Sequence, residues 1–148
     1  MVVSAGFAST VHWQINMRIY LTHCTGIKDN RLKGTSKAVG PNDLYTSMPL
    51  QRFVRKCKEQ KVQWAIFSDL YGVWHPHQHH LWYDKHPDTV TAHEMTQLVK
   101  DFDKELEDFS EIWFYNNPSW FHSLYKTLLK RSSLSNRITT FSRLKEIV

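Results

Sequence analysis

The sequence predicts an α/β fold, a single three-layer domain in which a four-stranded, mostly parallel sheet is flanked by helices. Short β-prone runs alternate with longer segments whose apolar residues recur at helical spacing. The order is strand, helix, strand, helix, strand, helix, strand, which is typical of parallel strands joined by right-handed crossovers. No internal repeat or interdomain linker interrupts this order, and 148 residues are enough to bury a core within one domain.

The first half of the pattern predicts a strand, a helix and a second strand. Residues 18–22 form a β-prone run that leads into a glycine-containing loop. A helix is expected after Ser47, because serine is favoured at helix N-caps and Pro49 is tolerated in a first turn. Its apolar face consists of Leu50, Phe53, Val54 and Cys57. The short, mostly apolar run of residues 62–68 predicts a buried strand.

The second half begins with a loop rich in histidine, proline and tyrosine, from residue 69 to about 90. Thr91 and Glu94 have the spacing of a capping box and start a long helix with one apolar face. A third strand is expected at 112–115, and a helix at Asn117 and Pro118, since proline is common at the first helical position. A fourth strand at 137–141 and a short terminal helix at 143–148 complete the pattern.

Composition narrows the class of protein. The aromatic content of 14% argues against disorder, and no apolar run approaches the length of a membrane span. Two cysteines are too few for a disulfide scaffold and fit a reducing, cytoplasmic compartment. The net charge of +5 permits an anionic partner, a nucleotide or nucleic acid, without requiring one. The oligomeric state is left open.

The first 16 residues contain no Lys, Arg, Asp or Glu and end just before Met17. They lack the basic region and the longer apolar stretch of a secretory signal. Residues 1–16 are therefore interpreted as an extension ahead of a native start at Met17, or as an edge strand or interface arm. The α/β domain is assigned to residues 17–148.

Basic charge is concentrated in the first half, where residues 1–61 carry 10 Lys and Arg against 3 Asp and Glu. The densest part is a loop containing Lys28, Arg31, Lys33 and Lys37. A flexible basic loop of this kind is either a clamp for phosphates or a solvated surface.

A ligand site is expected where the carboxyl ends of the parallel strands meet, near a switch in strand order. This rule selects residues 23–28, 68–83, 116–119 and 140–143. Together they would form a polar cleft beside helix N-termini, which favour anions. Asn116, Asn117 and Ser119 are the binding candidates at the third strand, and Trp74, Trp82 and Trp120 could stack on a base.

Cys24 and the histidines are the candidates for reactive groups. Near helix N-termini and Lys28, the Cys24 thiol is either a nucleophile with a lowered pKa or a small residue at a sharp turn. Cys57 is assigned to the core. His75, His77 and His79 alternate, so they are either three zinc ligands or loop histidines bonded to backbone and solvent. His75, nearest the strand end, is the candidate general acid or base.

Three ordered motifs carry a resemblance. Cys24-Thr25-Gly26-Ile27-Lys28 has the form C-T-x-x-K, and Asp43-Leu44-Tyr45-Thr46-Ser47 has the form D-L-Y-x-S. Ser68-Asp69-Leu70-Tyr71-Gly72-Val73 has the form S-x-x-[YH]-G-[LV], with Tyr83-Asp84 after it. Over about residues 18–91 the chain resembles a family of small, uncharacterised α/β domains. That family is distantly similar to the archaeosine synthase core domain and to uracil-DNA-glycosylase-like folds.

The resemblance implies one pocket lined by the residues that match its motifs. These are Cys24, Thr25, Lys28, Asp43, Tyr45, Ser47, Ser68, Tyr71, Gly72, Tyr83 and Asp84. Gly26 joins them as part of the same loop. Three residues have a simpler interpretation as well. Ser47 suits a helix cap, Asp69 (alanine in the family) suits a turn, and Gly72 suits a tight turn with positive φ.

Strand-end polarity and the resemblance together predict an enzyme acting on a nucleoside, nucleotide or modified base, at an N-glycosidic bond or a base substituent. Ser68 would hold a phosphate or base edge, Asp69 or Asp84 would stabilise a cationic transition state or position water, and His75 would move a proton. Two alternatives stand beside it. One is a non-catalytic nucleotide- or nucleic-acid-binding module, and the other is a zinc-dependent hydrolase built on the histidines.

Overall fold

A computed structural model describes residues 17–116 and 121–148 of the chain. Its sheet contains β1 (Arg18–His23), β2 (Trp64–Ser68), β3 (Gly72–Trp74), β4 (Glu111–Tyr115) and β5 (Ile138–Phe141), in the order β3-β2-β1-β4-β5. All pairings are parallel except that of β3 with β2. The predicted α/β class is confirmed, but the sheet has five strands rather than four.

The additional strand, β3, lies within the segment predicted as a loop. The backbone turns after β2 at Gly72, whose φ is +74°, and the chain returns antiparallel with Ser68 opposite Gly72. The backbone N–H of Val73 donates a hydrogen bond at 2.8 Å to Oδ2 of Asp101, which lies in the helix Ala92–Glu105. A strand of three residues is too short to leave a periodic signal in the sequence.

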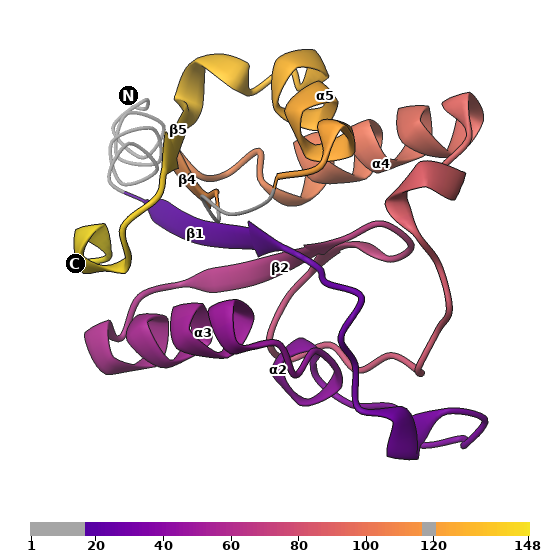
Figure 1. Cartoon of the computed structure of the whole chain (residues 1–148). Coiled ribbons are helices and arrows are strands. Elements are labelled where there is room, and N and C mark those ends of the chain that lie inside the picture. Colours follow the sequence, from indigo (N-terminus) through magenta and orange to yellow (C-terminus); the bar gives the residue numbers. More distant parts are fainter. Residues whose placement is uncertain (1–16, 117–120) are drawn as a thin grey trace, which may run out of the picture.

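Helices cover both faces of the sheet (Figure 1). One face is covered by α3 (Met48–Gln60), which follows the short α2 (Pro41–Leu44), and the other by α4 (Ala92–Glu105) and α5 (Ser123–Arg131). The capping box of Thr91 and Glu94 is confirmed at the start of α4. The helix expected at Asn117 begins instead at Ser123, and residues 117–120 lie outside the described residues. The terminal helix is one 3-10 turn, Leu144–Glu146.

The core forms between these layers, from strand residues that are apolar on both faces of the sheet. Leu21, Ala65, Phe67 and Phe114 are completely buried, as expected for parallel strands with helices on either side. Cys57 lies in this core, as predicted. Across residues 17–116 and 121–148, no helix has both the length and the apolar character needed to cross a membrane.

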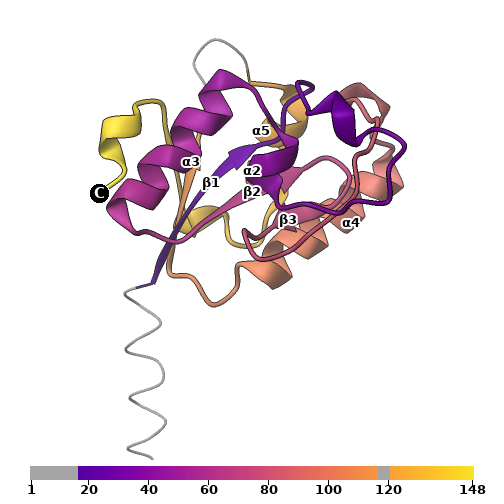
Figure 2. The same cartoon turned by 90° about the horizontal axis from the view of Figure 1, so that it is seen from below.

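The basic loop between β1 and α3 is anchored at several points. Lys28 pairs with Tyr45 and Val39 with His80 through isolated β-bridges, and Leu32 in the 3-10 turn Asn30–Leu32 is buried. Figure 2 shows this loop beside the segment that follows β3. The exposed Arg31 guanidinium pairs with Asp29 at 2.8 Å. The loop is therefore held in place by the rest of the fold, and its residues Arg31, Lys33 and Lys37 are exposed to solvent.

Candidate functional site

A cavity of about 410 Å³ lies at the carboxyl ends of β1 and β2. Its walls come from residues 23–27 at and after the end of β1, Ser47 and Pro49 at the start of α3, Asp69 after β2, residues 85–87, and Tyr125 of α5. Strand β1 lies between β2 and β4, so the direction of chain winding reverses beside it. This is the position at which open α/β sheets bind ligands, and the volume lies within the range of small-molecule sites.

Two of the four segments expected at this site meet there, those that follow β1 and β2. The described residues that line the cavity do not include Asn116 or residues 140–143, and Asn117 and Ser119 lie outside the described residues. Their places are taken by the start of α3, residues 85–87 and Tyr125. Thr25 and Gly26 line the cavity as the motifs imply.

Asp69 is the carboxyl of the cavity, and only 3% of the residue is exposed. Its Oδ1 accepts a hydrogen bond from the Tyr83 hydroxyl at 3.0 Å, and its backbone N–H donates to Cys24 Sγ at 3.3 Å. Burial raises the pKa of Asp69, while the Tyr83 hydrogen bond and the nearby Lys28 ammonium act in the opposite direction. The result is a carboxyl that takes up a proton more readily than an exposed aspartate.

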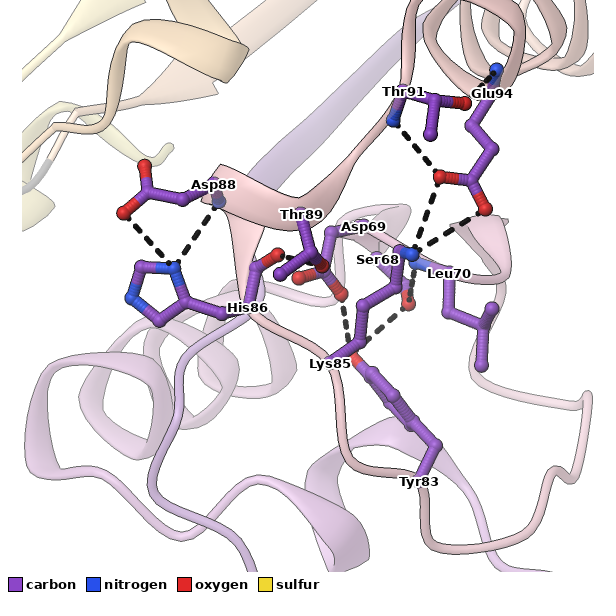
Figure 3. A network of polar contacts seen from close by, with 10 residues as sticks. All are labelled: Ser68, Asp69, Leu70, Tyr83, Lys85, His86, Asp88, Thr89, Thr91 and Glu94. Atoms are coloured by element: carbon purple, nitrogen blue, oxygen red, sulfur yellow. Dashed lines mark hydrogen bonds and ion pairs between the residues drawn. The ribbon is translucent and has the colours of Figure 1, made fainter.

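Tyr83 is the centre of a buried hydroxyl network (Figure 3). Its single proton goes to Asp69, so its oxygen accepts from its other two partners, Tyr45 and the Ser68 hydroxyl, the latter at 3.2 Å. Burial raises the pKa of both phenols, so they stay protonated at neutral pH. Ser68 Oγ also accepts from the backbone N–H groups of Leu70 and Tyr71 at 3.1 and 3.0 Å. Ser68 therefore closes the turn after β2 and is fully buried behind the cavity wall.

The Cys24 thiol lines the cavity but is not activated. Its Sγ lies 3.2 Å from the Tyr125 hydroxyl, and burial, with the nearby Asp69 charge, raises its pKa to about 12. The alternative of a nucleophile with a lowered pKa is therefore wrong, because burial removes the thiol from solvent and raises its pKa. Cys24 fits the alternative of a small residue at a close-packed turn.

The three alternating histidines do not converge. His75 Nε2 pairs with Glu105 at 3.2 Å, the His77 ring stacks on His75 with centroids 5.7 Å apart, and His79 is exposed near Gly40. Among the described residues, no group of three or more His, Cys, Asp or Glu side chains could hold a metal ion. His75 follows β3, whose antiparallel course carries the chain away from the cavity. The cavity walls accordingly contain none of these histidines.

The remaining motif residues lie around the cavity rather than in it. Lys28 is half-buried with Nζ 4.3 Å from the Tyr83 ring centroid, and the Tyr71 hydroxyl donates to the Leu81 carbonyl at 2.9 Å. Asp43 and Asp84 are exposed and belong to none of the cavity walls. The positive φ expected at Gly72 is confirmed.

Of the tryptophans expected to stack on a base, Trp74 is fully buried in the core and Trp82 is half-buried beneath Lys33. Trp120 lies outside the described residues. Asn116 donates its backbone N–H to the Phe141 carbonyl at 2.8 Å. These contacts stabilise the loops, and Trp74, Trp82 and Asn116 do not line the cavity.

Residues 85–89, which sequence reasoning did not single out, form a strap over one side of the cavity. The Lys85 ammonium reaches the Glu94 carboxylate at 3.3 Å, and Asp88 Oδ1 pairs at 2.6 Å with Nε2 of His122, the N-cap residue of α5 (Figure 3 shows Lys85, Glu94 and Asp88). The strap contains the 3-10 turn Pro87–Thr89. Its place in the site depends on packing against α4 and α5, and no local motif marks it.

Ser47 occupies the N-cap position of α3, as predicted, but its side chain makes no capping hydrogen bond. The residue is 4% exposed and lines the cavity. Its buried Oγ has no hydrogen-bond partner among the described residues. The expected role as a side-chain cap is therefore wrong.

Comparison with known proteins adds no relatives to this picture. No family model matches the chain, and neither a curated protein nor a solved structure matches it. The fold and the cavity define an α/β protein with a buried carboxyl at the carboxyl edge of a mostly parallel sheet. The resemblance based on the three motifs stays a prediction.

Proposed function

We propose that this protein is an enzyme that acts on a nucleoside, nucleotide or modified base, at the N-glycosidic bond, within the cavity at the ends of β1 and β2. The observation that carries the proposal is Asp69. It is a buried carboxyl in the cavity wall, oriented by a tyrosine and shifted towards a higher pKa by its surroundings. Perturbed carboxyls in clefts are frequent catalytic acids and bases.

Three features of the cavity support cleavage of a glycosidic bond. In its ionised form, Asp69 stabilises the positive charge that develops on the sugar, and burial strengthens that interaction by excluding water. Its raised pKa also makes Asp69 a stronger base towards an attacking water than an exposed aspartate would be. Ile27, Pro49 and Pro87 supply apolar surface against which the faces of a base can pack.

The other members of the predicted catalytic set have different places in this scheme. Ser68 acts as a positioning residue through Tyr83, which it contacts at 3.2 Å. His75 and Asp84 lie outside the cavity walls and are given no catalytic role. The proposed mechanism therefore depends on the Asp69 carboxyl alone, so substitution of Asp69 tests it directly.

The test is release of free base by the full chain, followed by chromatography. The substrates are the common ribo- and deoxyribonucleosides, their 5′-monophosphates and short single-stranded oligonucleotides. Wild-type protein is expected to release base from at least one of them. Asp69→Asn is expected to reduce the rate at least about 100-fold, the typical contribution of a general acid or base.

Asp43→Asn is the matched control, because it removes the same charge at an exposed site outside the cavity. It is expected to leave the rate unchanged. The proposal is wrong if no compound in the panel binds or reacts, or if Asp69→Asn retains the wild-type rate.

A second candidate function, non-catalytic binding of single-stranded nucleic acid, has support from the basic loop. Lys33 Nζ lies 5.2 Å and Lys28 Nζ 5.9 Å from the Trp82 ring centroid, so cations and an aromatic ring share one surface. Such surfaces bind single strands with a strong salt dependence. Fluorescence anisotropy with a labelled oligonucleotide is expected to show weakened binding in Lys33→Gln and at raised salt. Binding that is absent or insensitive to salt would exclude this function.

A further inference from the structure

The first turn of α3 faces the same cavity as Asp69 and is not capped. α3 has 13 residues, and the N–H groups of its first turn have no carbonyl acceptor within the helix. An N-cap side chain usually accepts one of these hydrogen bonds, but Ser47 does not. Pro49 carries no N–H, which leaves Met48 and Leu50 as first-turn donors.

The Ser47 hydroxyl is the second and independent observation. It is buried, belongs to a residue in the cavity wall, and has no hydrogen-bond partner among the residues that the structure describes. A buried hydroxyl without a partner costs free energy, and such groups are rare in folded proteins. A ligand oxygen in the cavity would supply the acceptor that this hydroxyl lacks.

The charges around this end of the cavity favour an anion. The first turn of α3 contains no acidic residue to balance the positive end of the helix dipole. Lys85, on the strap, contributes an ammonium group to the cavity wall, although it also pairs with Glu94. Asp69 is the only carboxyl among the described residues of the wall, and it comes from the end of β2 rather than from α3.

We infer that the start of α3 is a phosphate subsite and that the cavity takes a nucleotide in preference to the free nucleoside. The nucleoside part of this inference rests on the proposed function. The phosphate oxygens accept hydrogen bonds from the Ser47 hydroxyl and the first-turn N–H groups, as phosphates do at other helix N-termini. The phosphate itself is either the monoester of a free nucleotide or a diester within a nucleic-acid strand.

Isothermal titration calorimetry of the full chain measures the contribution of the phosphate. The titrants are each common nucleoside, its 5′-monophosphate, the matching dinucleoside monophosphate, and inorganic phosphate alone. For the nucleoside that binds, the 5′-monophosphate is expected to bind at least tenfold more tightly. In Ser47→Ala this advantage, measured against the nucleoside's affinity for the same variant, is expected to fall to less than threefold.

Thr46→Ala is the matched control, since it removes an exposed hydroxyl from the neighbouring residue, outside the cavity wall. It is expected to keep the full advantage of the monophosphate. Ser47→Gly provides a second variant in case the alanine protein folds poorly, because glycine is well tolerated at N-caps. A dinucleoside monophosphate that binds as tightly as the monoester supports the subsite and identifies the phosphate as that of a strand.

The outcomes separate this inference from the proposed function. Equal affinities for nucleoside and monophosphate, or a phosphate advantage that survives both Ser47 variants, would overturn the subsite and leave the proposed function standing. Binding of inorganic phosphate that Ser47→Ala abolishes, without binding of any nucleoside or nucleotide, would support an anion site and overturn the proposed function. Absence of binding by every titrant would overturn both.

Discussion

The hydroxyl of Tyr83 donates a hydrogen bond to Oδ1 of Asp69 at 3.0 Å and joins two separate chain segments at the cavity wall. Asp69 directly follows β2, and Tyr83 comes after β3 in the sequence. The same phenol is contacted by Tyr45 and Ser68, which fixes the direction of its proton. A hydrogen-bond network therefore orients the Asp69 carboxyl. Its residues belong to separate sequence motifs and come into contact only in the folded protein.

Tyr83→Phe is expected to raise the pKa of Asp69 further. The hydrogen bond from Tyr83 favours the charged form of the carboxyl, so its loss favours the protonated form. The variant also removes a partner of the Ser68 hydroxyl, so the free energy of unfolding is expected to fall by about 1–3 kcal/mol. Carbon-13 NMR titration of the Asp69 carboxyl measures the shift.

Tyr71→Phe serves as the control for Tyr83→Phe, because its hydroxyl donates to the Leu81 carbonyl and not to Asp69. It is expected to leave the pKa of Asp69 unchanged. An Asp69 pKa that stays constant or falls in Tyr83→Phe would show that the hydrogen bond does not act on the charged form.

In Asp69→Asn, the free energy of unfolding is expected to fall less than in the wild type as the pH rises. The pKa of Asp69 is higher in the folded protein than in the unfolded chain, so its stabilising contribution is complete below the unfolded pKa. That contribution is lost as the pH rises through the folded pKa. Asparagine cannot ionise, so the stability of the variant relative to wild type is expected to increase between about pH 3 and neutral pH.

Chemical denaturation at a series of pH values measures this difference, with Asp43→Asn as an exposed reference. A constant difference between Asp69→Asn and wild type across the series would contradict the raised pKa. If Asp69→Asn is also inactive, the ionised Asp69 carboxyl lowers the stability of the folded protein at neutral pH but is needed for activity.

Both cysteines are expected to react slowly in the folded protein. Burial, with the nearby Asp69 charge at Cys24, raises the pKa of Cys24 and Cys57 to about 12, so little thiolate exists at pH 8. Ellman's reagent is expected to titrate two thiols rapidly in guanidinium chloride and at least about 100-fold more slowly in native buffer. Cys57→Ala isolates the signal of Cys24. Rapid reaction of that variant in native buffer would show that the cavity exposes an activated thiol.

The sequence predicted those helices and strands that carry a continuous apolar pattern or a local capping motif. Residues 64–67 of β2 are apolar, and Thr91 and Glu94 cap α4 through hydrogen bonds between neighbours, so both elements could be found without tertiary information. β3 could not be found, since three residues define no period and the turn at Gly72 is stabilised by Asp101 from a distant helix. The alternation of strands and helices therefore predicted a four-stranded, mostly parallel sheet and omitted the antiparallel β3.

The candidate site was predictable where residues directly follow a strand. Thr25 and Asp69 reach the cavity because β1 and β2 are parallel neighbours, which places their carboxyl ends side by side. Lys85 and Tyr125 reach it through the packing of the strap and α5, for which no short motif exists. The clustering of histidines in sequence was misleading, because β3 carries His75 back along the sheet.

Gly72→Ala is expected to destabilise the fold strongly. Its φ of +74° is unfavourable for any residue with a Cβ, and an added Cβ would lie 2.2 Å from Asp101 Oδ2. That oxygen accepts the Val73 N–H at 2.8 Å, so the side chain cannot move away without breaking the bond between β3 and α4. The combined strain and lost hydrogen bond are expected to reduce the free energy of unfolding by about 2–4 kcal/mol.

Urea denaturation compares Gly72→Ala with Gly26→Ala, where an added Cβ meets no atom within 4 Å. The Gly26 variant is expected to stay within about 0.5 kcal/mol of wild type, as is usual for an open surface position. Gly72→Ala/Asp101→Ala separates the two causes, because it removes the clash but keeps the positive φ. If Gly72→Ala alone matches the Gly26 variant, the turn that returns β3 to β2 adopts a different conformation from the one described.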